Sequence, residues 1–197
     1  MDSRFAAGMM LSAALGCSLV TACCAAAQAQ FFWDPDRYGG PVGRMFGFPS
    51  SPIPRTLVTF SGPYRPGTIV INTSERRLYL VTAPGQALRY GIGVGRIGFT
   101  WSGVRTVSMK REWPDWTPPV QMLRRRPDLP RHMVGGIDNP LGARAIYLGS
   151  SLYRIHGSNE PETIGQAVSS GCFRLTNEDV VDLYDRVRVG AKVVVLR

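Results

Sequence analysis

The sequence predicts a mainly β domain with one or two short helices and one long loop. Short apolar segments rich in β-branched residues alternate with polar turns after residue 67, which is typical of strands. Only one stretch near the C-terminus carries the start and stop signals of a helix. The length of 197 residues fits one domain with an additional tail or linker, and the apolar share of 44% is sufficient for its core.

Residues 1–29 are typical of a secretory signal peptide. Arg4 precedes an apolar run over residues 5–22, and residues 27–29 read Ala-Gln-Ala, a small-x-small cleavage site. Two alternatives stay open. The apolar run approaches the roughly 18 residues of a membrane span, and "VTAC", which ends at Cys23, resembles the lipobox of bacterial lipoproteins. The sequence thus predicts export to the periplasm or cell envelope, with membrane attachment only if Cys23 is lipidated or the signal is uncleaved.

Residues 30–66 are rich in Gly, Pro, Ser and aromatic residues and have no helical or strand period, so we expect an extended linker. Thr56–Phe60 is a candidate short strand within it. The domain then covers residues 67–197, and its first three strands are separated by the turns "TSER" and "APG", the pattern of a β-meander. The predicted strands are Thr68–Asn72, Arg77–Val81, Gln86–Val94, Gly103–Glu112, Ala143–Gly149, Leu152–Gly157, Ala167–Leu175 and Ala191–Arg197.

The clearest helix covers residues 176–190. Thr176 or Asn177 can cap its N-terminus, acidic residues occupy its first turn and arginines its last, and Gly190 is expected to end it. A further helical turn is expected to open at Pro161. The apolar face of the main helix consists of Val180, Tyr184 and Val187.

Residues 113–142 contain six prolines and show no clear period. Long irregular insertions inside compact domains often serve as lids or binding loops, so we expect this loop to help select the substrate. A second motif, "GIGVGRIG" over residues 91–98, shares only its letters with a phosphate-binding loop. No helix follows it, and it predicts a strand and a turn instead.

The net charge of +9 comes almost wholly from arginine, because Lys110 and Lys192 are the only lysines. Such a surplus favours either an anionic partner or a solvated basic surface. The only tight basic cluster is "RRR" at residues 124–126, without interleaved aromatic residues. With export predicted, charge alone does not indicate a nucleic-acid partner.

The four cysteines are Cys17, Cys23, Cys24 and Cys172. Cleavage near residue 29 removes three of them and leaves Cys172 without an intramolecular disulfide partner. An unpaired thiol in an exported protein is exposed to oxidation and mispairing, which favours a role for its reactivity. The alternative is a buried, inert cysteine.

A cysteine nucleophile requires a base within hydrogen-bond reach. The sequence has only two histidines, His132 and His156. His156 ends an apolar strand sixteen positions before Cys172, so that two neighbouring strands can bring both side chains to one edge of a sheet. His132 lies in the Pro-rich loop and is interpreted as a surface residue. No His, Cys or Asp cluster has metal-ligand spacing, and we expect neither a metal nor a cofactor.

The residues beside Cys172 fit the same chemistry. Ser170 and Gly171 are small and allow close approach of a substrate backbone. The backbone N–H groups of Gly171 and Cys172 are candidates for an oxyanion site. Arg174 would share a face with Cys172 on a strand and could bind a substrate carboxylate, or alternatively form an intramolecular ion pair.

The stretch from His156 to Val187, "HGSNEPETIGQAVSSGCFRLTNEDVVDLYDRV", closely resembles the signature of the L,D-transpeptidases, the YkuD-type domain of bacterial cell-wall synthesis. "PGTIVINTSERRLYLV", "WTPP" and "DNPLGARAIYL" also resemble that family in order. The resemblance implies a β-sandwich, with Cys172 as nucleophile, His156 as its base and the carbonyl of Gly157 as the group that orients the ring. The sequence departs from the family at Ser170, where many members have histidine, and some members have asparagine in place of Arg174.

The resemblance implies a murein acyltransferase. Its substrate would be a tetrapeptide stem of peptidoglycan, and the acceptor a stem amine, a lipoprotein or water, giving crosslinking, lipoprotein attachment or L,D-carboxypeptidase trimming. A non-catalytic murein-binding module is the alternative from another class. The presence of both His156 and Cys172 favours the enzyme.

Overall fold

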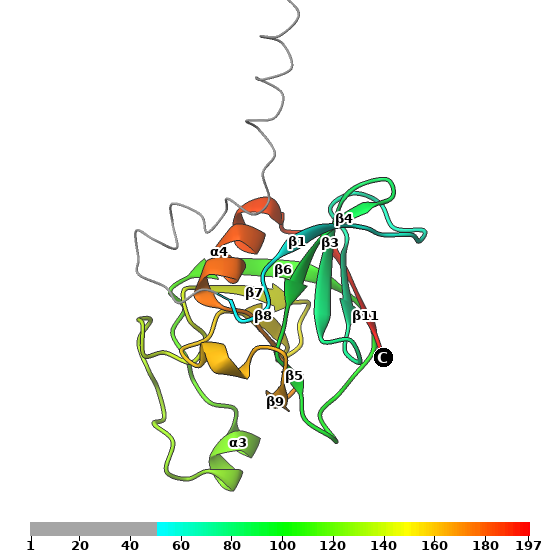
Figure 1. The fold of residues 1–197 in the computed structure, drawn as a ribbon. Helices are drawn as coiled ribbons and strands as arrows, with labels where there is room; N and C mark the ends of the chain where they lie inside the picture. The colour runs from blue at the N-terminus through cyan, green and yellow to red at the C-terminus, as the bar shows by residue number, and fades with distance from the viewer. Residues whose placement is uncertain (1–50) are drawn as a thin grey trace, which may run out of the picture. The chain divides into compact units, whose positions relative to one another are not determined.

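The computed structural model describes residues 51–197, which belong to one compact unit. The predicted signal peptide and residues 30–50 of the predicted linker lie outside the described residues. Strands dominate, and the helices are short: α3 (Val120–Arg125), α4 (Asn177–Arg186) and the 3-10 helix η2 (Pro161–Thr163) (Figure 1). The prediction of a mainly β fold with one or two short α-helices is confirmed.

Nine strands of the described chain form one sheet in the order β1-β4-β3-β2-β11-β6-β7-β8-β10. Two neighbouring pairs, β2 with β11 and β8 with β10, are parallel, and the other pairs are antiparallel. The strands are β1 (Thr56–Thr59), β2 (Ile69–Asn72), β3 (Arg77–Ala83), β4 (Gln86–Gly91), β6 (Gly103–Glu112), β7 (Arg144–Leu148), β8 (Arg154–His156), β10 (Phe173–Arg174) and β11 (Lys192–Leu196). A separate parallel pair consists of β5 (Val94–Gly95) and β9 (Ala167–Ser169).

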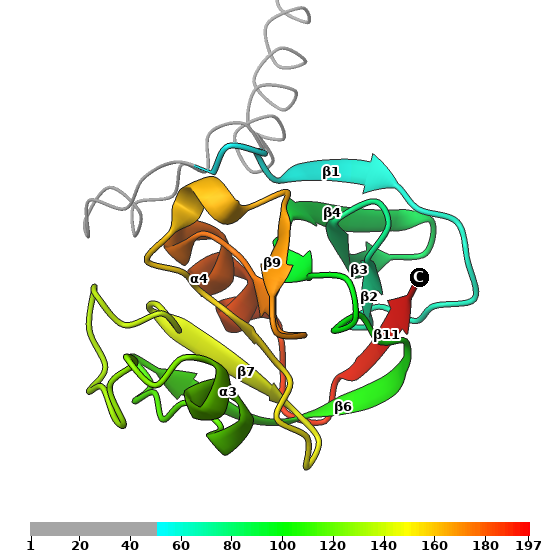
Figure 2. The same ribbon diagram turned by 90° about the horizontal axis from the view of Figure 1, so that it is seen from below.

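The long strand β6 joins the two halves of the sheet (Figure 2). Residues 103–106 of β6 pair with β11, whereas residues 107–112 pair with β7. One apolar core contains side chains from both halves and from α4, among them Ile71, Ile146 and Leu183. The halves thus bury their inner faces against a shared core, as expected for a β-sandwich.

Helix α4 begins as predicted and ends earlier. The Thr176 hydroxyl accepts a hydrogen bond from the Asp179 backbone N–H (3.2 Å), which caps the N-terminus. The last helical residue is Arg186, and Val187 is already extended with its side chain buried in the core. Gly190, at φ +91°, lies in the turn that leads into β11, so the prediction that it ends the helix is wrong.

Two predicted strands are interrupted. The segment Gln86–Val94 divides into β4 and β5 because Gly93 exchanges two backbone hydrogen bonds of 2.9 Å with Arg174, which draws the chain away from β3. The segment Ala167–Leu175 divides into β9 and β10 at Gly171. These interruptions place the residues around Cys172 against the β5 segment.

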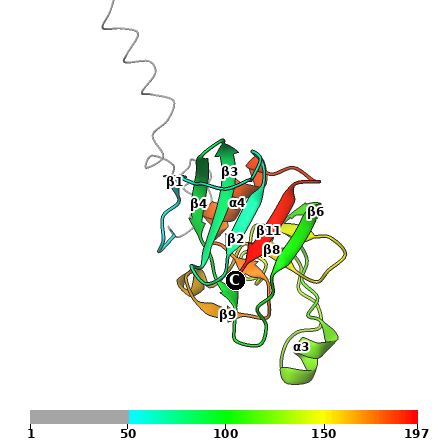
Figure 3. The ribbon, with the colours of Figure 1, turned by 90° about the vertical axis from the view of Figure 1, so that its right-hand side faces the viewer.

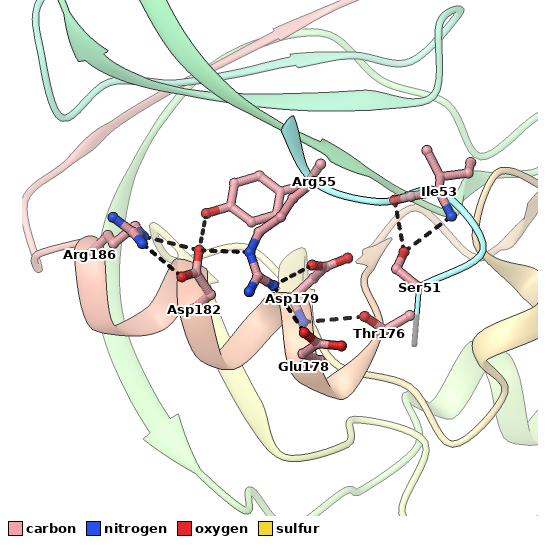
Figure 4. A network of polar contacts seen from close by, with 9 residues as sticks. Ser51, Ile53, Arg55, Thr176, Glu178, Asp179, Asp182 and Arg186 are labelled. Carbon is pink, nitrogen blue, oxygen red and sulfur yellow. Dashed lines mark hydrogen bonds and ion pairs between the residues drawn. The ribbon is translucent and has the colours of Figure 1, made fainter. Parts of the chain in front are cut away.

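The end of the predicted linker is part of the domain. Strand β1 pairs with β4 at the sheet edge, and the preceding Arg55 is buried. The Arg55 guanidinium lies 2.9 Å from Asp179 and 3.9 Å from Asp182, both on α4 (Figure 4). The Asp182 carboxylate also accepts a hydrogen bond from the buried Tyr90 hydroxyl (2.6 Å). An ion-pair network therefore ties the segment before β1 to α4.

The long loop over residues 113–142 contains α3, which its irregular sequence did not predict (Figure 3). A β-bridge between Trp116 and Met133 joins the two arms of the loop. The Asp115 carboxylate accepts a hydrogen bond from the Gly135 N–H (2.9 Å), and the Asn139 side chain donates to the carbonyl of Val134 (2.9 Å). These contacts give the loop a defined shape although it has little regular structure.

Candidate active site

A cavity of about 1100 Å³ has both His156 and Cys172 in its wall. Much of the wall comes from the loop over residues 113–142, as expected of a binding loop. Among the described residues, five arginines line the cavity against two carboxylates, so that it favours an anionic ligand. The arginines are Arg96, Arg125, Arg126, Arg154 and Arg174, and the acidic residues are Asp138 and Glu160.

His156 lies at the end of β8, between β7 and β10, and is only 5% exposed. Its Nδ1 is 2.6 Å from the carbonyl oxygen of Gly157. Because a carbonyl can only accept, Nδ1 carries the hydrogen, and Nε2 keeps a free lone pair. Burial, together with the positive charges of Arg174 and Arg154, lowers the His156 pKa to about 3, against the opposing effect of the Gly157 carbonyl. The ring is therefore neutral at physiological pH.

Close packing holds the Gly157 carbonyl in place. A Cβ atom on Gly157 would lie 2.3 Å from the side-chain oxygen of Asn177, and only glycine leaves room for that oxygen. The same oxygen accepts a hydrogen bond from the Ala143 N–H (2.8 Å). The first residue of α4 and the start of β7 thus fix the backbone that contacts the imidazole. This arrangement is compatible with the orienting role that the resemblance implies for Gly157.

Cys172 lies in the turn directly before β10. In that strand, Arg174 is paired with His156 of the parallel neighbour β8. The Cys172 Sγ is half-buried and 3.7 Å from the Leu152 carbonyl. Burial raises the Cys172 pKa above its ordinary value of 9.0, partly offset by a backbone hydrogen bond from Arg154 and by two arginine charges. The resting site therefore contains a neutral thiol and a neutral imidazole.

A tight turn presents Cys172 to the cavity. Gly171 has φ +106°, and a Cβ there would lie 2.7 Å from the Tyr153 ring. The Ser169 hydroxyl donates to the Cys172 carbonyl (2.6 Å) and accepts from the Gly171 N–H (3.1 Å). The continuous strand predicted for residues 167–175 is wrong, because this glycine and this serine together reverse the chain direction locally.

The two backbone donors proposed for an oxyanion site differ in their availability. The Gly171 N–H is occupied by Ser169, whereas the Cys172 N–H makes no hydrogen bond within residues 51–197. Ser170 lines the cavity beside Cys172. Of the two candidate donors, the Cys172 N–H is thus the one open to a ligand.

Arg174 lines the same cavity and pairs with Glu160 at 2.8 Å. The intramolecular ion pair, which the sequence left open as an alternative, is the arrangement in the structure. A role of Arg174 in carboxylate binding stays a prediction.

Sequence reasoning missed four residues around Cys172: Trp101, Tyr153, Arg154 and Ser169. The Trp101 indole donates to the Gly171 carbonyl (2.9 Å) and stacks on Tyr153 at 4.6 Å between ring centroids. Trp101 is 70 positions from Gly171, and no sequence signal links them. Arg154 could have been found, because it precedes His156 by two positions and shares its face of the strand.

Other sequence predictions concern His132, metal binding and membrane attachment. His132 is 53% exposed, 3.2 Å from the Thr117 hydroxyl and 3.7 Å from the Asp115 carboxylate, which agrees with its interpretation as a surface residue. Within residues 51–197, no group of three His, Cys, Asp or Glu side chains could hold a metal. No helix in that range is long and apolar enough to span a membrane.

Residues 66–195 match the YkuD family, the L,D-transpeptidase catalytic domain. This chain belongs to that family. The chain is 41% identical over 137 residues to the probable L,D-transpeptidase ErfK/SrfK of Escherichia coli, covering 65% of this chain and 43% of the relative. It is also 41% identical over 136 residues to the probable L,D-transpeptidase YcfS of Escherichia coli, covering 64% and 42%. The chain thus spans less than half the length of these curated relatives.

Solved structures of L,D-transpeptidases share the fold. An L,D-transpeptidase from Mycobacterium smegmatis superposes with a TM-score of 0.54 at 17% identity, covering 76% of this chain and 69% of that one. L,D-transpeptidase 3 from Mycobacterium tuberculosis, in complex with a faropenem-derived adduct, gives 0.50 at 17% identity, covering 66% and 60%. The YkuD-like β-sandwich predicted from the sequence is confirmed by this likeness.

Proposed function

We propose that this L,D-transpeptidase family member is an exported cysteine acyltransferase acting on peptidoglycan stem peptides. The observation that carries the proposal is the pair of His156 and Cys172 in the wall of one arginine-rich cavity. Family membership supports murein as the substrate. The stem peptide is rich in carboxylates, which suits the positive cavity.

In the first half of the reaction, Cys172 Sγ attacks the carbonyl carbon between the third stem residue, meso-diaminopimelate, and the terminal D-Ala. The thiol proton passes to Nε2 of His156, the nitrogen that does not face the Gly157 carbonyl. The backbone N–H of Cys172 can donate to the oxyanion that forms. The C–N bond then breaks, His156 returns the proton to the departing amine, and a thioester on Cys172 remains.

In the second half, the side-chain amine of another stem attacks the thioester carbon. His156 takes a proton from the amine and returns it to the Cys172 sulfur as the C–S bond breaks. The product is a crosslink between the third residues of two stems. Attack by water instead gives L,D-carboxypeptidase trimming, and attack by a lipoprotein amine attaches that protein to murein.

The charge state of the resting pair determines when the proton moves. With the pKa of His156 lowered to about 3 and that of Cys172 raised, both groups are neutral at pH 7. The proton therefore transfers during attack, with His156 as general base, and no preformed thiolate is required.

The decisive experiment compares the mature protein with its Cys172→Ala variant on purified tetrapeptide stems and on a carbapenem. We expect the wild type to give dimeric or trimmed stems and a covalent adduct visible by intact mass, and the variant to give neither. Circular dichroism verifies that the variant is folded. If the folded variant keeps either activity, the proposal is wrong, and murein binding without any mass change in the wild type would support a non-catalytic module.

The same mass measurement tests export. Signal-peptide cleavage is expected to give a mature chain that starts after Ala29. A mature chain that carries a diacylglyceryl group on Cys23 would show lipidation instead.

A further inference from the structure

Arg154 occupies the wall of the cavity next to both reactive side chains. It lies two residues before His156 on β8, and alternate residues of a strand project to the same face. The Cys172 thiol donates to the carbonyl of Leu152, two positions before Arg154, at 3.7 Å. Arg154, His156 and Cys172 all line the same cavity.

The guanidinium of Arg154 has no acidic partner in the described part of the chain. No carboxylate of residues 51–197 lies within 4.0 Å of it, and its Nε is buried without a hydrogen-bond partner. Its one described contact is with the ring of Tyr147, 5.0 Å from Cζ to the centroid. A charged side chain without a counter-ion is stabilised by an anion bound beside it, and the part of Arg154 that lines the cavity can receive one.

Two other arginines of the cavity already have acidic partners: Arg174 pairs with Glu160 at 2.8 Å, and Arg126 pairs with Asp128 at 2.6 Å. Arg96 and Arg125 have no ion pair among residues 51–197 but lie over the Phe99 ring, at 4.4 and 5.0 Å from its centroid. Arg154 thus offers a planar fork of donors to a ligand without first breaking an ion pair.

The charge of Arg154 affects the pKa of both Cys172 and His156, so it lies close to both side chains. Burial has the largest effect on each: it raises the pKa of Cys172 and lowers that of His156. Among the smaller effects, the charge of Arg154 lowers the pKa of both. A ligand anion on Arg154 would therefore also lie beside the reacting atoms.

We propose that Arg154 binds the terminal carboxylate of the donor peptide, the carboxylate of the residue that leaves. This inference rests on the proposed function and names the terminal carboxylate as the feature of the substrate that the site recognises. In a peptide, three bonds separate the scissile carbonyl carbon from the carboxylate carbon of the next and last residue. The group that binds that carboxylate must therefore lie next to the nucleophile, as Arg154 does. The site would then select peptides whose scissile bond precedes a free C-terminus.

The test uses two donors, a stem tetrapeptide with a free C-terminal carboxylate and the same peptide as its C-terminal amide. We expect the wild type to prefer the carboxylate by about 100-fold in kcat/KM, since removing one partner of a buried charged pair has effects of this order. Arg154→Gln is expected to lose most of that preference, because kcat/KM falls much further for the carboxylate than for the amide, which loses only the effect of the charge on Cys172 and His156. Arg154→Lys, which keeps the charge without the planar fork, is expected to lie between them.

Three comparisons make the result decisive. Arg111→Gln removes an exposed arginine of β6 outside the cavity and should behave as the wild type. A wild-type donor preference in Arg154→Gln would overturn the inference, whether kcat/KM falls equally on both donors or on neither. Equal losses would indicate that the charge only assists the thiol. If Arg154→Gln does not fold, Arg154→Lys provides the same comparison.

Failure of the inference is distinguishable from failure of the proposed function. If Cys172→Ala abolishes acylation while Arg154→Gln and Arg154→Lys keep the wild-type donor preference, only the role of Arg154 is wrong. If Cys172 of the wild type is acylated by neither donor, the proposed function is wrong, and the inference is wrong with it.

Discussion

The hydroxyl of Ser169 holds the backbone on both sides of Gly171, donating to the carbonyl of Cys172 at 2.6 Å and accepting from the N–H of Gly171 at 3.1 Å. One buried side chain thus satisfies two backbone groups of the turn that carries the thiol. The turn lies between strands, because β9 ends at Ser169 and β10 begins at Phe173, and the Trp101 indole donates to its Gly171 carbonyl at 2.9 Å.

Ser169→Ala should loosen this turn. The substitution leaves a buried N–H and a carbonyl without their partner, and we expect a loss of about 1–3 kcal/mol in unfolding free energy. We also expect about a tenfold slower acylation of Cys172, because the thiol is less well positioned. Urea denaturation and intact-mass kinetics measure the two effects. The adjacent Ser170→Ala is the control for stability, and equal destabilisation of both variants would contradict the role of the Ser169 hydroxyl.

The reactivity of Cys172 toward iodoacetamide should depend on pH as that of a buried neutral thiol. Burial raises the Cys172 pKa above 9.0, so we expect the alkylation rate to rise with pH through a midpoint above that value. We expect no step near pH 6.5, because the His156 pKa is lowered to about 3. A midpoint below pH 7 would instead indicate a preformed thiolate–imidazolium pair. Mass spectrometry at fixed reagent concentration gives the profile.

His156 should make the fold sensitive to acid. Its pKa is about 3 in the folded state and 6.5 as the ordinary value, so that the unfolded state binds the proton first as pH falls. The contribution of His156 to the unfolding free energy is complete above pH 6.5 and is lost progressively toward pH 3. Between pH 7 and 4.5, this single group accounts for about 2–3 kcal/mol of unfolding free energy.

The measurement is urea denaturation at pH 7 and 4.5 for the wild type, His156→Gln and His132→Gln. We expect the difference in unfolding free energy between the two pH values to shrink by about 2–3 kcal/mol in His156→Gln. His132, whose side chain is 53% exposed, provides the matched control and should leave the difference unchanged. The same pH dependence in all three proteins would show that His156 is not the source.

Gly157→Ala should disturb both the fold and the orientation of His156. The added Cβ would lie 2.3 Å from the Asn177 side-chain oxygen and 3.1 Å from the Ala143 nitrogen, so that backbone or side chain must move. We expect about 2–3 kcal/mol of destabilisation and slower acylation. Gly136→Ala is the control, because a Cβ at Gly136 meets nothing within 4 Å. Thermal melts that are equally lowered by both substitutions would argue against this packing.

Arg55→Ala should be among the most destabilising substitutions of the segment before β1. It leaves the buried Asp179 carboxylate without its cation, which typically costs about 3–5 kcal/mol, whereas Asp182 keeps its pair with Arg186 at 2.9 Å. Arg65→Ala, an exposed arginine in the next turn, is the control. Urea denaturation measures both variants. A small effect of Arg55→Ala would mean that water or other groups compensate the carboxylate.

Local sequence patterns were sufficient for most of the fold. The strand over residues 103–112 has the predicted bounds, and the cap at Thr176 is where the pattern indicated it. Local patterns did not predict α3, whose six residues lie among prolines and bury no side chain, so they leave no apolar period to detect. The candidate strand over residues 56–60 within the predicted linker is present as β1, whose four residues pair with β4.

The sequence by itself determined the mainly β architecture, through short-range periodicity, and the family, through its resemblance to L,D-transpeptidases. It also predicted the candidate pair of His156 and Cys172. The tertiary structure decided the state and surroundings of that pair. Burial sets the neutral forms of His156 and Cys172, Ser169 closes the turn, and Arg154 rather than Arg174 is left without an acidic partner among the described residues. These properties depend on desolvation and on contacts between strands distant in sequence, neither of which a local pattern encodes.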